Sequence, residues 1–213
     1  PYNGSPATIT KSREKILECI PQNVSQEANC ASQIISTLVG NAFRRPVTDA
    51  DVAVMMDFFR IGREEGGSFD YGIEGALQRI LVDPEFIYRA EIEPEGTAED
   101  SLYQISDLEL ASRLSFFLWS SIPDAELIEI ASQGRLHGSK ILREQVQRMI
   151  ADPRSSAFVE NFTGQWLNVR GMAASEPVVD LFPDFDSTLR DAFQIEIEMF
   201  FGSVIYEDRS ILN

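Results

Sequence analysis

The sequence predicts an all-α protein made of two small helical subdomains, each of the helical bundle type, joined by an acidic linker. Apolar residues recur at spacings of three and four, the period of a helix that buries one face. Capping residues, prolines and glycines divide the chain at helix-sized intervals. No strong two-residue alternation is present, and short strands near residues 87–92 or 103–105 are the one alternative. We expect a first domain over residues 1–93 and a second over residues 101–213.

The first long helix is expected from about Gln26 to Arg44. Ser25 is a candidate N-cap, because its hydroxyl can accept a hydrogen bond from a backbone N–H of the first turn. Pro46 ends the helix, since the residue before a proline is driven out of the α region. The buried face of this helix is expected to consist of Ala31, Ile34, Ile35, Leu38, Val39 and Ala42.

Two more helices complete the first domain. Thr48 opens one of them, with acids in the first turn, where the positive end of the helix dipole favours negative charge. The glycines at 66–67 end it, because glycine readily adopts the left-handed conformation of a helix C-terminus. The other helix is expected over residues 69–81 and is broken by Asp83 and Pro84.

Residues 91–100, EIEPEGTAED, form the expected linker. They contain five acids, one proline and one glycine, and almost nothing that a core could bury. Such a composition is typical of a solvated connection. We interpret the charge run as solvated surface and not as a binding site.

The second domain begins with a capping box. Ser106, followed three residues later by Glu109, predicts a helix from Asp107 to about Ser120. The residues of this helix that are expected to face inward are Leu110, Leu114, Phe117 and Leu118. Four further helices are expected in this domain. The first is short, with Pro123 in its first turn and its end near Gly134, and the second begins at Ser139. The third runs from Ser155 to Val169, and the fourth from about Asp186 to Tyr206.

Charge and composition exclude several classes of function. The chain has 34 acids against 18 bases and a formal net charge of -16, which disfavours nucleic acid and anionic membranes as partners. No apolar run approaches the roughly 20 residues that span a bilayer. The sequence has no phosphate-binding glycine loop, no serine nucleophile elbow and no haem-attachment motif. With two cysteines and one histidine, no metal site and no cofactor are expected in this chain.

The two cysteines, Cys19 and Cys30, are separated by ten residues that include a proline and helix-capping side chains. A disulfide between them would close a loop of about 12 residues, worth roughly 3 kcal/mol in the chain-entropy model. It would pin the segment after Leu17 to the first turn of the next helix. Two free structural thiols are the alternative.

Arg44 and Arg45 are a candidate anion site, because guanidinium groups suit carboxylates and phosphates. The favoured interpretation is structural, since cations stabilise a helix C-terminus and arginine can hold loop carbonyls or neighbouring acids. Arg113 lies close to an apolar face and needs a partner, for which Glu160 and Asp191 are candidates. A substrate carboxylate or a haem propionate is the functional alternative for Arg113.

One helix carries a polar and aromatic patch. Asn161 and Gln165 are four residues apart and share a face, whereas the adjacent Trp166 fits the apolar stripe and is expected in the core. Glu160 could pair with Glu196 or Glu198 across two helices as an acid–base couple. The candidate polar cluster is Arg113, Glu160, Asn161, Gln165 and Glu196.

His137 and two aspartates complete the candidates. His137 lies in a polar turn and is expected to be a free surface imidazole, or an axial haem ligand only if a partner presents haem to it. Asp184 and Asp186 alternate faintly like a calcium loop but lack its glycine and glutamate. Helix capping by Asp186 is the favoured interpretation.

Several stretches of the chain together resemble a known group of proteins: CASQIISTLVGNAFRRPVTDADV, GGSFDYGIEGALQRILVDPEFIYRAE, LASRLSFFLWSSIPDAEL and FVENFTGQWLNVR. They are similar to large exported planctomycete proteins that combine planctomycete-specific domains of unknown function with c-type cytochrome modules. The resemblance covers nearly the whole chain. It implies two adjacent domains, of which the second continues past residue 213 in the family.

The resemblance also implies a compartment and partners, but no reaction. An exported, periplasmic or cell-surface location would preserve a disulfide between Cys19 and Cys30. The c-type haem would belong to other domains of the full-length protein. The implied partners are neighbouring domains of the same polypeptide, including a cytochrome module.

Three functions are compatible with these features. The first is a non-catalytic interaction or scaffold module in a multidomain protein associated with cytochrome c. The second is part of an oxidoreductase or a polysaccharide-processing enzyme whose active site is completed by other domains. The third is a carbohydrate-binding module that uses Trp119 or Trp166. The lack of a complete catalytic constellation in the sequence favours the first.

Overall fold

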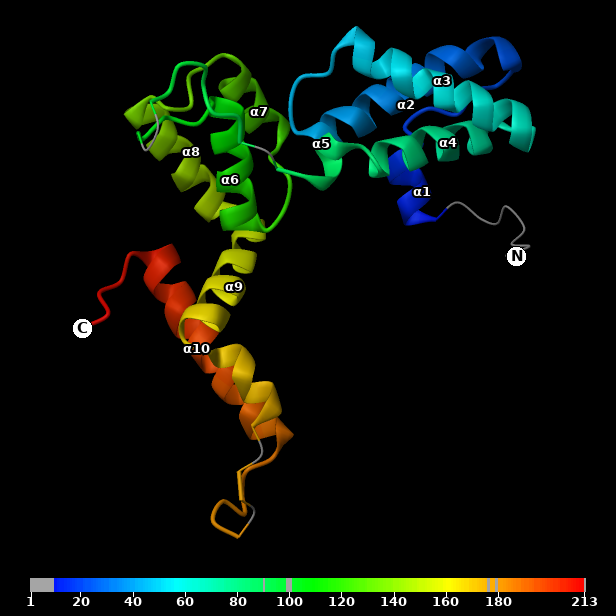
Figure 1. Ribbon diagram of the computed structural model, residues 1–213. Helices are drawn as coiled ribbons and strands as arrows, with labels where there is room; N and C mark the ends of the chain where they lie inside the picture. The colour runs from blue at the N-terminus through cyan, green and yellow to red at the C-terminus, as the bar shows by residue number, and fades with distance from the viewer. Residues whose placement is uncertain (1–9, 90, 99–100, 176, 179, 213) are drawn as a thin grey trace. The chain divides into compact units, whose positions relative to one another are not determined.

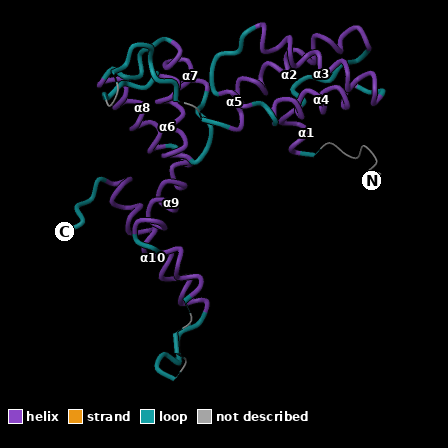
Figure 2. Tube along the Cα trace, in the orientation of Figure 1, coloured by secondary structure: helices purple, strands orange, loops and turns teal. Residues whose placement is uncertain are grey.

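The computed structural model describes residues 10–89, 91–98, 101–175, 177–178 and 180–212. These residues form helices and loops, and no strand is present among them (Figure 2). The predicted all-α class is therefore confirmed, and the strand alternatives are wrong for the described residues. The chain divides into two compact units, Pro1–Ile105 and Ser106–Asn213, each with a hydrophobic core of its own.

Unit 1 is built around three long helices that lie side by side (Figure 1). Its elements are α1 (Lys11–Ile16), α2 (Val24–Phe43), α3 (Asp49–Gly66), α4 (Phe69–Leu81) and α5 (Pro84–Ile87). The apolar stripe of α2 is buried against α3 and α4, because each of these helices turns its own apolar stripe inward. The largest contributors to this core are Ile34, Ile35, Val39, Met55, Phe59, Ile73 and Ile80.

The local signals of unit 1 mark its helix ends well. α4 spans the predicted residues, and α3 begins after a capping box in which Thr48 and Asp51 satisfy each other's backbone N–H groups. α2, however, begins at Val24, with Asn23 as its N-cap. The predicted cap at Ser25 is wrong, because its hydroxyl hydrogen-bonds the Asn23 side chain at 2.6 Å from within the helix.

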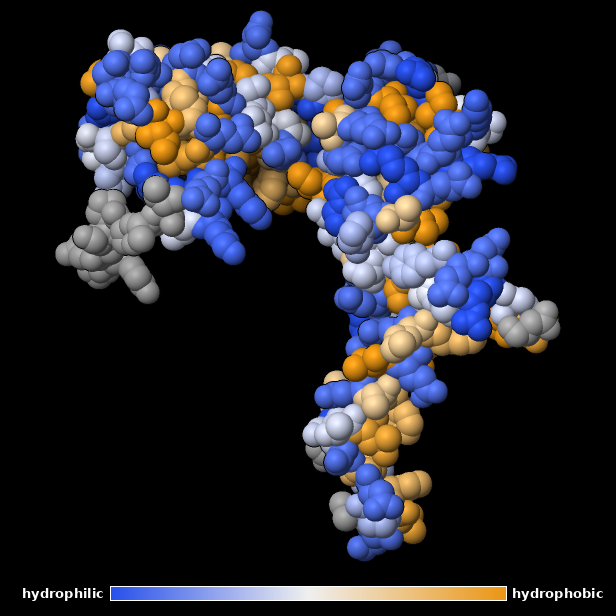
Figure 3. All heavy atoms as spheres, turned by 180° about the vertical axis from the view of Figure 1, so that it is seen from behind, coloured by the Kyte–Doolittle hydropathy of each residue, from blue (hydrophilic) through white to orange (hydrophobic). Residues whose placement is uncertain are grey.

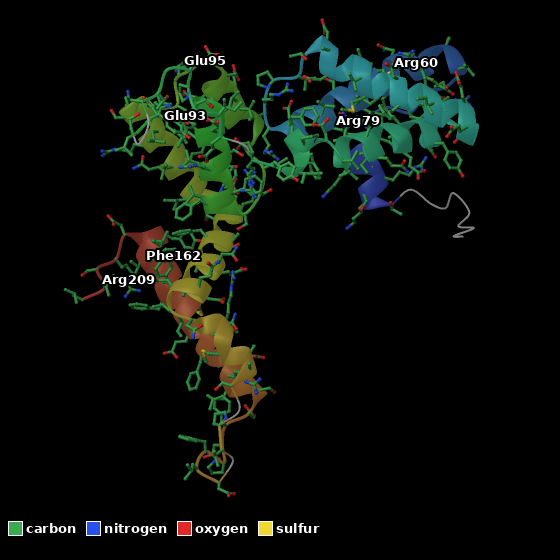
Figure 4. All side chains as sticks on the ribbon, in the orientation of Figure 1. Arg60, Arg79, Glu93, Glu95, Phe162 and Arg209 are labelled. Carbon is green, nitrogen blue, oxygen red and sulfur yellow. A yellow bond between two sulfur atoms is a disulfide. The ribbon has the colours of Figure 1, made fainter. Side chains whose placement is uncertain are left out.

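Residues 91–98 of the expected linker are described as loop, and the remaining residues, 99–100, lie outside the described part. Glu93 and Glu95, both labelled in Figure 4, are exposed, as expected for a solvated charge run. The Thr97 hydroxyl donates to the Pro94 carbonyl oxygen at 2.6 Å and closes a local turn.

Unit 2 has a compact head and a helical hairpin. Its elements are α6 (Asp107–Trp119), α7 (Ala125–Ser132), α8 (Ser139–Ala151), the 3-10 helix η1 (Pro153–Ser155), α9 (Ser156–Trp166), the 3-10 helix η2 (Val169–Ala174) and α10 (Ser187–Glu207). The predicted capping box of Ser106 and Glu109 opens α6. The core of the head contains Leu118, Trp119, Leu127, Leu136 and Met149. α10 runs back along α9 to form the hairpin (Figure 1).

Three expectations for unit 2 are corrected. α7 begins at Ala125 with Asp124 as its N-cap, so Pro123 lies before the helix and not in its first turn. α9 ends at Trp166, three residues short of the expected end, since Asn168 adopts a left-handed conformation with φ of 56°. Phe117 is exposed, and its ring packs edge-on against Phe158 of α9 at 5.0 Å instead of entering the core.

Candidate functional site

Arg44 and Arg45 bind groups of this chain at the corner between α2 and α3. Arg44 is the left-handed C-cap of α2, and its Nη2 donates to the carbonyl oxygens of Glu85 at 2.8 Å and Tyr88 at 3.4 Å. Arg45 donates from Nη1 to Asp51 Oδ2 at 2.7 Å and from Nε to Glu85 Oε2 at 2.8 Å. The pair therefore ties the end of α2 to the start of α3 and to α5.

The electrostatics of this corner follow from its contacts. Hydrogen bonding from Arg45 holds the pKa of Asp51 well below its ordinary value, although partial burial opposes the shift. The hydrogen bonds to Asp51 and Glu85 raise the pKa of Arg45. Burial, with a contribution from Arg89, lowers the pKa of Arg44. Since both guanidinium groups are engaged by the chain itself, the structural interpretation fits better than an anion site.

The disulfide between Cys19 and Cys30 is present, with 5.6 Å between the Cα atoms, so that prediction is confirmed. Cys30 is buried, and Cys19 packs against the same core. Because α2 begins at Val24, the bond meets its second turn and not its first. The bond thereby fastens the segment after α1 to the central helix of unit 1.

His137 is not the free imidazole that the sequence suggested. Its Nδ1 lies within hydrogen-bonding distance of Asp107 Oδ1, and the backbone N–H of Leu136 donates to the other oxygen of the same carboxylate. Asp107 is the first residue of α6, so the turn before α8 is held at the start of a helix about 30 residues earlier. Such a distant partner leaves no signal in the local sequence.

The candidate polar cluster is largely solvent-facing. Arg113 is exposed on α6, and Glu160 and Gln165 are exposed on α9, as is Glu196 on α10. Among the described residues, no hydrogen bond joins Glu160, Gln165 and Glu196 to one another. The side-chain amide of Asn161 is hydrogen-bonded to other residues of this chain.

Asn161 links three segments of unit 2. Its Nδ2 donates to Ser120 Oγ at 2.8 Å, and Arg170 Nη2 donates to its Oδ1 at 2.5 Å. Both ends of the amide are therefore used in holding α9 to the end of α6 and to η2. At the other end of the hairpin, Asp186 accepts from the backbone N–H of Leu189 at 2.7 Å, which confirms its capping role.

The two tryptophans differ in burial, and the one that was expected in the core is exposed. Trp166 is 67% exposed, so its placement in the core is wrong. Trp119 is buried, its Nε1–H donates to the Met149 carbonyl oxygen at 2.9 Å, and Arg154 stacks 3.5 Å from the ring centroid. A sugar could reach only Trp166 of the two.

The α9–α10 hairpin exposes a large apolar area, visible as orange side chains along this arm in Figure 3. Phe162 of α9 stacks on Phe201 of α10 at 5.5 Å and forms the seam between the helices (Figure 4). Outside that seam lie exposed apolar side chains that we call the hairpin surface: Trp166, Leu167, Phe193, Ile195, Met199 and Phe200. The apolar residues of α10 are spread around the whole helix, so contact with one neighbouring helix cannot cover them all. Among the described residues of α10, Gly202 is the one that is buried.

The sequence interpretation missed a groove along α3 and α4, lined in part by Phe58, Ile61, Tyr71 and Val82. The signal was available in principle. Phe58 and Ile61 are three residues apart, and they form a second apolar stripe on α3 beside the buried stripe of Met55.

Comparisons with known proteins follow the same division of the chain. Residues 30–91 match PSD5, described as a protein of unknown function (DUF1595), and residues 105–213 match PSD4, described as a protein of unknown function (DUF1592). No curated protein and no solved structure matches the chain. In the part of the chain that is described, no helix is long and apolar enough to cross a membrane, and no three His, Cys, Asp or Glu side chains are grouped to hold a metal ion. The resemblance to two adjacent domains of unknown function is confirmed, and the chain belongs to the PSD4 (DUF1592) family, whose model covers just over half of it.

Proposed function

We propose that the domain pair is a non-catalytic interaction module that docks neighbouring domains through the hairpin surface. The observation that supports this most directly is the exposure of Trp166, Met199 and Phe200, at 67%, 69% and 56%. Large exposed apolar areas are uncommon on monomeric soluble proteins and usually mark contact sites. Aromatic and methionine side chains are also the types enriched at the centre of protein interfaces.

A photo-crosslinking amino acid at position 200, introduced into the natural polypeptide in its own cells, tests this proposal. We expect crosslinks from position 200 to residues outside this chain, identified by mass spectrometry. The matched control is position 144, since Glu144 is exposed on α8 of the same unit and lies off the hairpin surface. Crosslinks from position 200 only within the hairpin, or equal yields at both positions, would contradict the proposal.

We further propose that one partner is a c-type cytochrome module, as the family resemblance implies. The net charge of -16 supports a basic partner, because attraction between opposite charges accelerates the encounter of two proteins. Salt weakens this attraction. A basic c-type cytochrome added to the chain should bind at low salt and dissociate as the salt concentration rises. Lack of binding at low salt would remove the cytochrome from the proposal and leave the docking role to other partners.

An exported location is the third part of the proposal. The Cys19–Cys30 disulfide supports it, since such bonds form and persist in oxidising compartments. Thiol alkylation of intact cells before lysis should find both cysteines blocked in the disulfide. Free thiols in the native protein would argue for a reducing compartment.

Carbohydrate binding is the second candidate function, and the exposed indole of Trp166 favours it, since sugar rings stack on aromatic faces. A glycan array probed with the chain should then show binding that is lost in Trp166→Ala. An array without binding would count against this candidate.

A further inference from the structure

A groove of about 480 Å³ runs along the α3–α4 hairpin of unit 1. Phe58 and Ile61 of α3 line it, and so do Tyr71 of α4 and Val82, the C-cap residue that follows α4. Its volume lies within the roughly 300–1,000 Å³ of sites that bind ligands or side chains. This surface lies in the first domain and is distinct from the hairpin surface of the proposed function.

Glycines create the groove by letting the two helix backbones approach. A Cβ on Gly62 would lie 2.4 Å from the Tyr71 carbonyl oxygen, and one on Gly75 would lie 2.7 Å from that of Phe58. Both contacts are far too short for a side chain, so glycine is required at these positions. The consequence is a floor of helix backbone between apolar walls.

The walls of the groove are apolar and open to solvent. Phe58, Ile61 and Val82 are 38%, 51% and 64% exposed. The same hairpin already buries Met55 and Ile80 in the core of unit 1. The hairpin thus has two apolar faces, and the second has no cover within the described residues of this unit.

The charge beside the groove is negative. Every arginine of α3 and α4 has an acidic partner: Arg60 pairs with Asp57, Arg63 with Glu27 and Arg79 with Asp83. Arg79, labelled in Figure 4, is the cation that lines the groove, and it lies 2.8 Å from Asp83. Glu65 and Glu74 also line the groove, and no cation among the described residues forms an ion pair with either. The groove therefore presents two carboxylates that lack cationic partners, one from each helix.

We propose that this groove receives an amphipathic helix of a protein partner that carries Lys or Arg beside its apolar face. Apolar side chains of the partner would cover Phe58 and Ile61, while its cations would meet Glu65 and Glu74. Phe58 and Glu65 are seven residues apart, roughly 10 Å along α3, so about two turns of helix would span the groove. This is the helix-in-groove mode of recognition.

Other occupants fit less well. An extended peptide would leave its backbone N–H and C=O groups unpaired here, because the groove is made of helices whose backbones are already bonded. A second copy of this chain would bring another charge of -16 to an acidic surface. An anionic membrane is repelled for the same reason.

A labelled helical peptide of leucine and lysine, with leucines at i, i+3, i+4 and i+7, is the probe for the intact chain. We expect binding by fluorescence anisotropy at about 50 mM salt, and about tenfold weaker binding to the double variant Glu65→Lys/Glu74→Lys. The control variant Glu129→Lys/Glu144→Lys makes the same charge change on exposed acids of unit 2 and should alter the Kd by less than about twofold. Ile61→Asp should weaken binding by at least about tenfold, since it places a charge on the apolar wall.

Several results would overturn the proposal. One is an equal loss of affinity in the control variant, which would show general charge attraction. Another is a matched peptide with glutamate in place of lysine that binds equally well. Chain dimers or lipid-vesicle binding that Ile61→Asp abolishes would assign the groove to a second copy or to a membrane instead. Circular dichroism checks the fold of each variant, and Ile61→Ser replaces Ile61→Asp if the latter fails to fold.

Discussion

Removal of the Asp51 carboxylate should destabilise unit 1 by about 3 kcal/mol. The carboxylate accepts from Arg45 Nη1 and Nη2 at 2.7 and 3.0 Å, and from the backbone N–H and hydroxyl of Thr48 at 2.8 and 2.7 Å. Hydrogen bonds to charged groups contribute about 1.5–3 kcal/mol net, and a capping interaction about 1 kcal/mol. Asp51 is 16% exposed and Arg45 is 26% exposed, so solvent screens their ion pair only partly.

A double-mutant cycle isolates the ion pair from the capping box. Asp51→Ala removes both, whereas Arg45→Met leaves Thr48 and Asp51 to cap α3 and should cost about 1.5 kcal/mol. The double variant also loses the contact between Arg45 and Glu85, so it should cost about 3.5 kcal/mol, still less than the sum of the two single variants. A coupling energy below about 0.5 kcal/mol would refute the view that Arg45 and Asp51 act as one unit.

The assay can separate the two units of the chain. Both tryptophans, Trp119 and Trp166, lie in unit 2, so tryptophan fluorescence follows unit 2 during urea unfolding while far-ultraviolet circular dichroism follows both units. Because each unit has its own core, Asp51→Ala should move the dichroism transition and leave the fluorescence transition in place. An equal shift in both signals would show that the units unfold together and would refute the assignment of the effect to unit 1.

Three further expectations concern acid stability, glycine packing and the core tryptophan. Since Arg45 holds the folded-state pKa of Asp51 below its ordinary value of 3.8, the carboxylate stabilises the fold above that pH, and this stabilisation is lost as the pH falls toward the folded-state pKa. The stability difference between the wild type and Asp51→Asn in urea titrations should therefore shrink from about pH 5 to about pH 2. Gly75→Ala should destabilise unit 1 by about 2 kcal/mol in the dichroism transition, because the new Cβ would lie 2.7 Å from a carbonyl oxygen of α3. Trp119→Phe should cost about 2 kcal/mol through its lost buried hydrogen bond, whereas the exposed Trp166→Phe should change the unfolding free energy by less than about 0.5 kcal/mol.

Each of these has a distinct contrary outcome. A stability difference between the wild type and Asp51→Asn that stays constant with pH would mean that Arg45 does not lower the pKa of Asp51 in the folded protein. A neutral Gly75→Ala would mean that α3 and α4 can separate without loss. Equal costs at Trp119 and Trp166 would contradict their opposite burial.

Helix ends were predictable where a few neighbouring residues determine them. Thr48 and Asp51 form a capping box within one turn, and so do Ser106 and Glu109. The physical cause lies in the first turn, whose N–H groups need acceptors, so a window of four residues contains the information. Ser25 failed because Asn23, two residues earlier, is an equally good cap, and local sequence does not choose between two such residues.

Contacts between distant segments were the part that sequence did not predict. His137 and Asp107 are 30 residues apart, and their pairing depends on how the turn after α7 packs against the start of α6. The disulfide was easier, because its cysteines are only 11 positions apart in the sequence and few chain paths join them. A contact is therefore harder to predict from sequence when the chain between its two residues is longer and can adopt more conformations.

α10 shows why the candidate polar cluster was not predictable and why the same helix is the best candidate for docking. Each residue turns a helix by about 100°, so an apolar stripe fixes which arc is buried only when the other arcs are polar. In α10 apolar residues such as Phe193, Ile195 and Phe201 lie on several arcs, and the sequence does not say which of them meets α9. The structure gives that place to Phe201 and leaves Phe193 and Ile195 exposed, with Glu196 beside them. A helix that is apolar on several arcs but covered on one is stabilised further by any partner that covers the rest.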